Sequence, residues 1–111
     1  MNEQPQPWPG CDWLWTDDSD LDQLVVHVQG TVAAERADHM WEAFEWAAEH
    51  AVGRLIVFDL TRAASFDRTS LLAFTEIARA ATRRRDDLRV VLGPHSTLGL
   101  YLRSYGLVNL A

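Results

Sequence analysis

The sequence predicts one α/β domain with a mixed, mainly parallel sheet of about five strands and with helices packed against it. Short apolar runs alternate with segments of helical periodicity in the order β-β-α-β-α-β-α-β. One run, Leu-Ile-Val-Phe at residues 55–58, is continuously apolar, which is typical of a strand covered on both faces. Because strand–helix–strand connections are right-handed, the alternation favours parallel pairing after an initial hairpin.

Length and composition indicate a single globular unit. The chain has 111 residues, of which 48% are hydrophobic and 23% charged. We divide it into an N-terminal arm, residues 1–11, and a domain over residues 12–111. The arm holds three of the four prolines, so we expect it to be flexible or extended.

A β-hairpin is expected at the start of the domain. Residues 12–16 (DWLWT) and 24–28 (LVVHV) favour strands, and the acidic segment 17–22 (DDSDLD) is typical of a tight turn. Gln29 and Gly30 are expected to end the second strand.

Two long helices are expected at residues 33–51 and 69–84, because apolar residues recur there at intervals of three and four. The first stripe consists of Ala37, Met40, Trp41, Phe44, Ala47, Ala48 and Ala51, and the second of Leu71, Phe74, Ala78 and Ala81. Gly53 is expected to stop the first helix.

Strands at residues 55–60 and 88–92 are expected on either side of the second helix. A turn-rich connector would join residue 60 to the helix start. After Gly93, residues 96–104 favour a short third helix and residues 107–110 a last strand.

Charge and cysteine content argue against several classes of protein. The net charge of −6 disfavours nucleic acid as the main partner. Arginines gather near the end of the second helix, where a solvated helix terminus explains them better than a nucleic-acid surface; they are Arg79, Arg83, Arg84, Arg85 and Arg89. With one cysteine, no membrane-length apolar run and no signal pattern, we expect a reduced cytoplasmic protein that does not enter membranes.

Acidic and hydroxyl side chains gather where the third strand leads into the second helix. Asp59 ends the apolar run and, with Thr61, is expected to fix the following turn. Asp67, Thr69 and Ser70 are all good helix N-caps. A helix start of this kind can receive an anion, a phosphoryl group or a partner protein.

Signatures of catalysis are missing. Asp59 and Asp67 could form an acid–base or Mg²⁺ pair, but an anchored turn and a helix cap explain them more simply. The histidines lack metal-ligand spacing, the serines lack a nucleophile elbow, and no glycine-rich phosphate loop occurs. We therefore assign no catalytic residue, no metal and no cofactor. Trp13, Trp15 and Trp46 could be exposed interface anchors or could be covered by the arm, and both alternatives stay open.

The chain resembles the STAS domain, the fold of bacterial anti-sigma-factor antagonists and of sulfate-transporter tails, over residues 12–110. The residues that carry the resemblance are Leu24–Gly30, Leu55–Thr61, Phe66–Leu71, Leu88–Gly93 and Tyr101–Leu107. Residues 66–71 match the family's signature turn, Asp-Ser-Ser/Thr-Gly-Leu, with two changes: Arg68 replaces the hydroxyl that an anti-sigma kinase phosphorylates, and Ser70 replaces the glycine.

The resemblance implies a non-enzymatic regulator of bacterial transcription that binds an anti-sigma factor or serine kinase-like protein, or another STAS protein, with a homodimer also open. It places the partner site at residues 66–71 and the start of the following helix, with Asp67, Arg68, Thr69 and Ser70 exposed. The partner-binding residues it implies are Asp67, Arg68, Thr69, Ser70 and Leu71. Thr69 and Ser70 are the remaining candidates for phosphorylation. The alternatives from other classes are a small-ligand or nucleotide-binding module using the same helix N-terminus, and a scaffold or oligomerisation domain.

Overall fold

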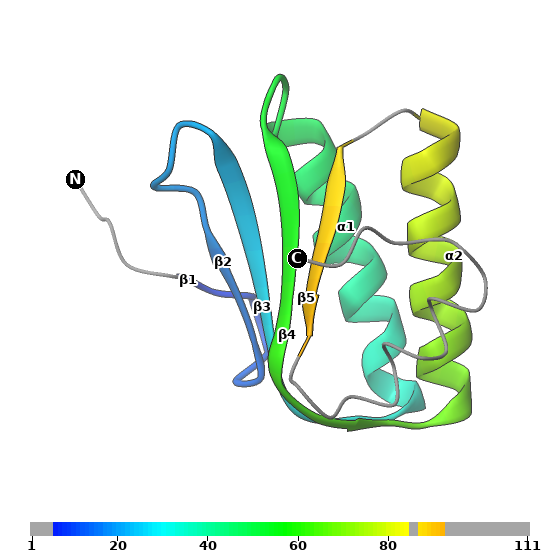
Figure 1. Ribbon diagram of the computed structural model, residues 1–111. Helices are drawn as coiled ribbons and strands as arrows, with labels where there is room; N and C mark the ends of the chain where they lie inside the picture. Colours follow the sequence, from blue (N-terminus) through cyan, green and yellow to red (C-terminus); the bar gives the residue numbers. More distant parts are fainter. Residues whose placement is uncertain (1–5, 85–86, 93–111) are drawn as a thin grey trace.

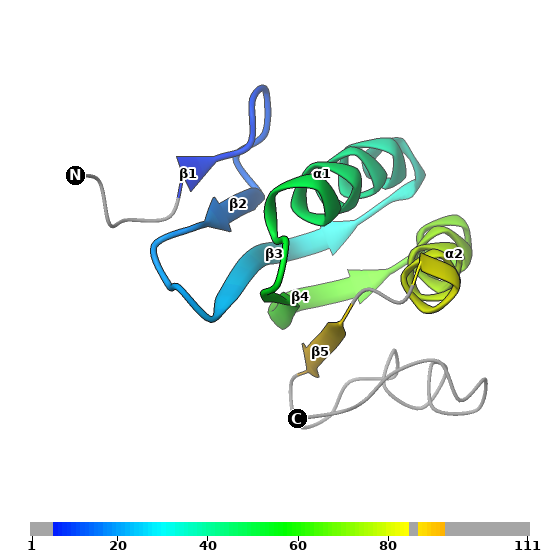
Figure 2. The ribbon, with the colours of Figure 1, turned by 90° about the horizontal axis from the view of Figure 1, so that it is seen from above.

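In the part of the chain that the structure describes, the fold is a five-stranded sheet with two α-helices, α1 and α2, on one of its faces (Figures 1 and 2). The computed structural model describes residues 6–84 and 87–92. Its elements are β1 (Gln6–Pro7), β2 (Leu14–Asp17), β3 (Gln23–Val32), η1 (Ala34–Arg36), α1 (Ala37–His50), β4 (Leu55–Phe66), α2 (Arg68–Arg84) and β5 (Leu88–Leu92). The α/β class and the arrangement of the sheet that the sequence predicts are confirmed.

The strands lie side by side in the order of the sequence. β1, β2 and β3 pair antiparallel, and β3, β4 and β5 pair parallel. Each parallel pair is joined through a helix, and both helices lie on the same side, as a common hand of crossover requires (Figure 2). The hairpin of β2 and β3 therefore extends a parallel sheet at its edge.

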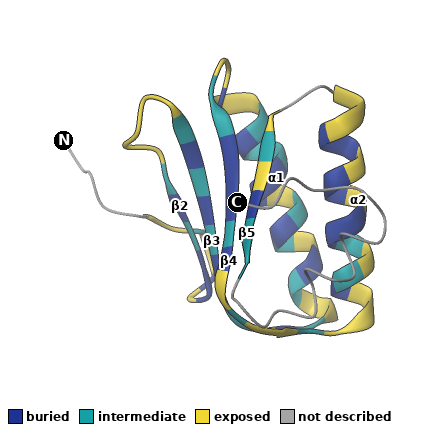
Figure 3. Cartoon of the chain, in the orientation of Figure 1, coloured by how far each residue is buried: buried dark blue, intermediate teal, exposed yellow. Residues whose placement is uncertain are grey.

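The core lies between the sheet and the helices. Alternate residues of β2 and β3 are buried there, such as Leu14, Leu24 and Val26, because successive strand side chains point to opposite faces. The helices contribute their apolar stripes, which Figure 3 shows as dark bands facing the sheet. The largest fully buried side chains are Phe44, Phe58, Phe74, Leu14, Leu24, Met40, Leu60, Ile77, Val26, Val28 and Val32.

Two strands are longer than the sequence predicts. β3 does not stop at Gly30 but continues to Val32, because its last residues pair with the second half of β4, and Gly30 tolerates the φ of +79° that it adopts inside the strand. The expected connector after Leu60 is instead the second half of β4, which pairs with the end of β3 up to Val32↔Phe66. Register shifts between His27 and Gln29 and between Gly30 and Thr31 let the 12 residues of β4 pair with the 10 of β3.

Part of the expected arm lies against the fold. Gln6 and Pro7 form the edge strand β1, a place in a sheet that tolerates proline. Trp8 packs edge-on against Trp46, with 5.9 Å between the ring centroids. Cys11 is buried in the core. The packed structure therefore includes residues 6–11.

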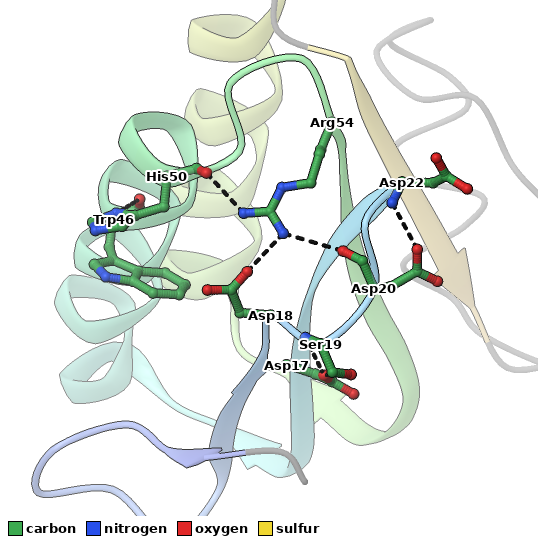
Figure 4. Close-up of polar contacts among 8 residues, drawn as sticks. All are labelled: Asp17, Asp18, Ser19, Asp20, Asp22, Trp46, His50 and Arg54. Atoms are coloured by element: carbon green, nitrogen blue, oxygen red, sulfur yellow. Dashed lines mark hydrogen bonds and ion pairs between the residues drawn. The ribbon is translucent and has the colours of Figure 1, made fainter. Parts of the chain in front are cut away.

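The acidic turn after β2 is held against the end of α1 by one arginine (Figure 4). The Arg54 guanidinium donates to Asp18 Oδ1 at 2.6 Å, to the Asp20 carbonyl at 3.1 Å and to the His50 carbonyl at 2.8 Å. The last of these contacts satisfies a carbonyl at the C-terminal end of α1. Because Arg54 is mostly buried against these groups, it fixes the loop.

The two helices lie close to their expected bounds, and β5 lies on the expected residues. The apolar periodicity of the two helices was sufficient to predict them from the sequence. The helix expected at residues 96–104 and the strand expected at 107–110 lie outside the described residues.

Removing the side chain of Phe58 should destabilise the domain strongly. Phe58 is fully buried and meets Phe74 of α2 edge-on at 5.5 Å. We expect Phe58→Ala to cost about 3–5 kcal/mol of unfolding free energy in denaturant melts. Leu55→Ala at the half-buried start of the same strand should cost clearly less. Equal losses would show that Phe58 does not lie at the centre of the core between the sheet and the helices.

Candidate functional site

The start of α2 is organised around Asp67. Its Oδ1 accepts a hydrogen bond from the Ser70 backbone N–H at 2.8 Å, and its carbonyl accepts one from the Leu71 N–H at 3.0 Å. Asp67 is thus the N-cap, as the sequence predicts. Its Oδ2 also accepts from the Ala34 N–H at 2.7 Å. One carboxylate therefore ties the first turn of α2 to the start of η1.

The hydrogen bonds to Asp67 stabilise its charged form. The Ser70 N–H is the largest cause that lowers the pKa of Asp67 below its ordinary value, and the Ala34 N–H adds to it. The helix N-terminus is consequently already occupied by a negative charge. A second anion at the same N–H groups would meet repulsion, which weakens the alternative of a nucleotide site there.

The side chains after Asp67 differ in exposure. Arg68 and Thr69 are exposed, whereas Ser70 is fully buried and its Oγ has no hydrogen-bond partner among the described residues. The expectation that Ser70 is exposed is therefore wrong, because Ser70 lies on the helix face that also buries Phe74. Leu71 is half-buried and packs against the core.

Leu72 is a surface residue that the sequence analysis missed. Its side chain is 48% exposed, and the part of the chain that the structure describes has only two other large exposed apolar side chains, Leu21 and Val52. It lies four residues after Arg68 and three after Thr69, so the three share one face of the helix. The same helical spacing that buries Ser70 was the available signal.

Asp59 and Thr61 do not form the expected turn, because both lie within strand β4, but they are bonded to each other and Asp59 has a further partner. Its Oδ1 accepts from the Thr61 N–H at 3.0 Å and from Thr61 Oγ1 at 2.6 Å. Its Oδ2 lies 2.9 Å from His27 Nδ1 on the neighbouring strand β3. Partial burial raises the pKa of Asp59, but the hydrogen bonds from Thr61 and His27 outweigh that effect, and the pKa is lowered overall.

The structure does not bring the two aspartates together. Seven residues of extended chain, 60–66, lie between Asp59 and Asp67, which corresponds to a span of roughly 25 Å at about 3.3 Å per residue. Each carboxylate is bound by its own neighbours, so an acid–base pair between them has no geometric basis. No group of three histidine, cysteine or acidic side chains suited to a metal ion occurs among the described residues.

The tryptophans are mostly covered. Trp13 is buried, with the Arg36 guanidinium 4.9 Å above its ring, and Trp15 and Trp46 are half-buried.

The basic end of α2 is partly engaged in an ion pair, since Arg84 binds both carboxylate oxygens of Glu45 at 2.9 and 3.2 Å. The described part of the chain holds no helix long and apolar enough to span a membrane.

The comparisons with known proteins agree with this fold. The anti-sigma-factor antagonist SpoIIAA in its unphosphorylated form matches with a TM-score of 0.64 and 11% identity, over 88% of this chain and 86% of that one. The phosphorylated Bacillus cell-fate determinant SpoIIAA gives 0.68 and 11%, over 88% and 90%. A protein of the DUF3478 family from Shewanella loihica, described as having a SpoIIAA-like fold, gives 0.58 and 13%, over 99% and 87%.

No family model and no curated protein matches by sequence, so the likeness is one of fold. The class that the architecture defines is a STAS-like domain of the SpoIIAA type. The resemblance stated from the sequence is confirmed at that level.

Stability should fall in acid partly through Asp59. Because its folded-state pKa is depressed, the contribution of Asp59 is complete above the unfolded pKa of about 3.9 and is lost as the pH falls through the folded value. We expect Asp59→Asn to reduce the dependence of unfolding free energy on pH below about pH 5. Asp12→Asn, at an exposed site, is the matched control. An unchanged pH slope in Asp59→Asn denaturant melts would contradict this account.

Proposed function

We propose that this chain is a non-enzymatic regulatory domain that acts as an anti-sigma-factor antagonist and docks its partner through the start of α2. The observation that carries the proposal is the outward projection of Arg68, Thr69 and Leu72 from a turn that Asp67 fixes. The likeness of fold to SpoIIAA, whose structures are of an anti-sigma-factor antagonist, supports it. The partner would be a serine-kinase-type anti-sigma factor.

The chemistry of this surface indicates what the partner must offer. Leu72 provides an apolar contact between a cation at Arg68 and a hydroxyl at Thr69. An apolar side chain within a polar rim is the usual arrangement of an interface hot spot. The partner would therefore carry an apolar hollow with acidic groups at its edge. Asp67 would act indirectly, by holding the turn in the docking conformation.

Phosphorylation would act through Thr69. Ser70 is enclosed, so a kinase reaches its hydroxyl only if the helix start opens. A phosphate on Thr69 would add about −1.5 to −2 charges within one helical turn of Leu72 and would disfavour burial of that side chain against a partner. Arg68, the adjacent cation, would offset part of this charge.

Substitutions at the start of α2 should weaken partner binding. With a purified serine-kinase-type anti-sigma factor from the chain's own genome, we expect Leu72→Asp and Arg68→Glu to weaken binding about tenfold or more in calorimetric titrations. The Arg68→Glu effect should shrink at higher salt, because screening acts on rim charges.

The matched controls make the same two kinds of substitution at exposed positions away from the start of α2. Val52 is exposed in the loop at the opposite end of α1, and Arg89 is exposed on β5. Val52→Asp and Arg89→Glu should bind like the wild type. Equal affinities for all four variants would remove the start of α2 from the interface.

Phosphate should appear on Thr69 after incubation with such a kinase and ATP. We expect Thr69→Ala to abolish incorporation, measured by mass spectrometry. Ser70→Ala should retain it and should stay folded, since the Ser70 hydroxyl has no hydrogen-bond partner among the described residues. Phosphate found on Ser70, or retained in Thr69→Ala, would refute this assignment.

A further inference from the structure

A pocket of about 590 Å³ lies at the middle of β3 and β4, away from the start of α2. Its lining includes Trp15, His27, Gln29, Asp59, Thr61 and Arg62. Its volume falls within the range of roughly 300–1,000 Å³ that is typical of small-molecule sites. This pocket lies outside the proposed docking surface.

The pocket is on the sheet face opposite α1 and α2, the two α-helices of the described residues. Trp15, His27 and Asp59 form one row across β2, β3 and β4, since Trp15 pairs with His27 and His27 with Asp59. Their strand neighbours Leu14, Val28 and Phe58 are buried in the core with the helices. Side chains alternate along strands, so the row faces the other way.

An irregularity of the sheet directs Arg62 to this place. Asp59 holds Thr61 by two hydrogen bonds, and the β3–β4 register shifts there, so that Gln29 pairs with Arg62. Bulges commonly re-aim a side chain next to a site. Gly30, with φ +79°, adds a second irregularity on the adjacent strand.

The charges at the pocket favour an anion. Asp59 is the carboxylate among its described lining residues, and His27 and Thr61 already bind both of its oxygens. Arg62 is exposed and makes no ion pair with any described residue. Trp15 adds an aromatic ring at the other side of His27. A planar group can pack on Trp15 while its negative end reaches Arg62.

We propose that this pocket binds a small planar organic anion, with Arg62 binding the charged group, Trp15 packing against the ring, and the His27–Asp59 pair holding the floor of the site. A neighbouring hollow, whose lining includes Asp12, Arg36 and Gly30, shares Gln29 and Arg62 with the pocket. Because Asp12 adds a carboxylate there, the proposed anion site is confined to the pocket itself. The proposal does not depend on the proposed function, because none of these residues lies on α2.

Benzoate is the probe, and protein NMR spectra of the full chain are the measurement. We expect benzoate to shift the Trp15 indole N–H and the backbone N–H signals of Gln29 and Arg62 in a saturable way, with a dissociation constant of about 1 mM or below. Benzamide, which keeps the ring but lacks the charge, should bind about tenfold more weakly or not at all. Cyclohexanecarboxylate, which keeps the charge but lacks the planar ring, should also bind more weakly.

Variants locate the binding. Arg62→Gln should weaken benzoate binding about tenfold without unfolding the protein, because the side chain is exposed. Arg89→Gln, an exposed arginine on β5, is the matched control and should bind like the wild type. Absence of saturable shifts, shifts confined to α2, or equal binding by Arg62→Gln would each overturn the proposal.

Discussion

The parallel pairing of β3 with β4 is the constraint on which the rest of the structure depends. Twelve residues of β4 pair with ten of β3, so the longer strand must accommodate two extra residues. Asp59 fixes the first shift by binding Thr61 twice. The end of the pairing then brings the Asp67 N–H to the Val32 carbonyl at 3.1 Å and the Ala34 N–H to the Asp67 carboxylate. The same pairing thus shapes the pocket and positions the start of α2.

The sequence predicts those elements whose signal is local. The helices and the apolar runs at residues 55–60 and 88–92 follow from periodicity, because burial acts on neighbouring turns or alternate residues. The extensions of β3 past Gly30 and of β4 past Leu60 are different. Each half-strand alone has a polar, small-residue sequence typical of a loop. It is extended because the other half-strand is available for backbone hydrogen bonds, and no single-segment pattern reports that.

Within the candidate site, the sequence predicted the helix cap correctly. It also held the information about which of the following residues point inward and which outward, but that information was not applied to them. Asp67 before a helical stripe is a local signal. Ser70 lies four residues before Phe74, so the stripe itself would have placed it inward and Leu72 outward. The His27–Asp59 contact could not be predicted from the sequence, because the two residues are 32 positions apart and meet only through the register of two neighbouring strands. Burial of Trp13 under Arg36 likewise depends on where η1 is placed.

Net charge and local charge have different consequences at the docking surface. The chain carries −6 overall, which would oppose approach to an acidic partner, yet Arg68 offers a cation at the proposed docking surface. Screening acts over about 10 Å at 0.1 M salt, so repulsion between whole surfaces is weakened more than attraction between groups in contact. Salt would then ease the approach of the wild type and, because Arg68 is an exposed rim charge, would also reduce the contribution of Arg68. The absolute affinity combines overall repulsion with the local attraction of Arg68. The contribution of Arg68 is therefore given by the difference in affinity between the wild type and a charge-changed variant at one salt concentration.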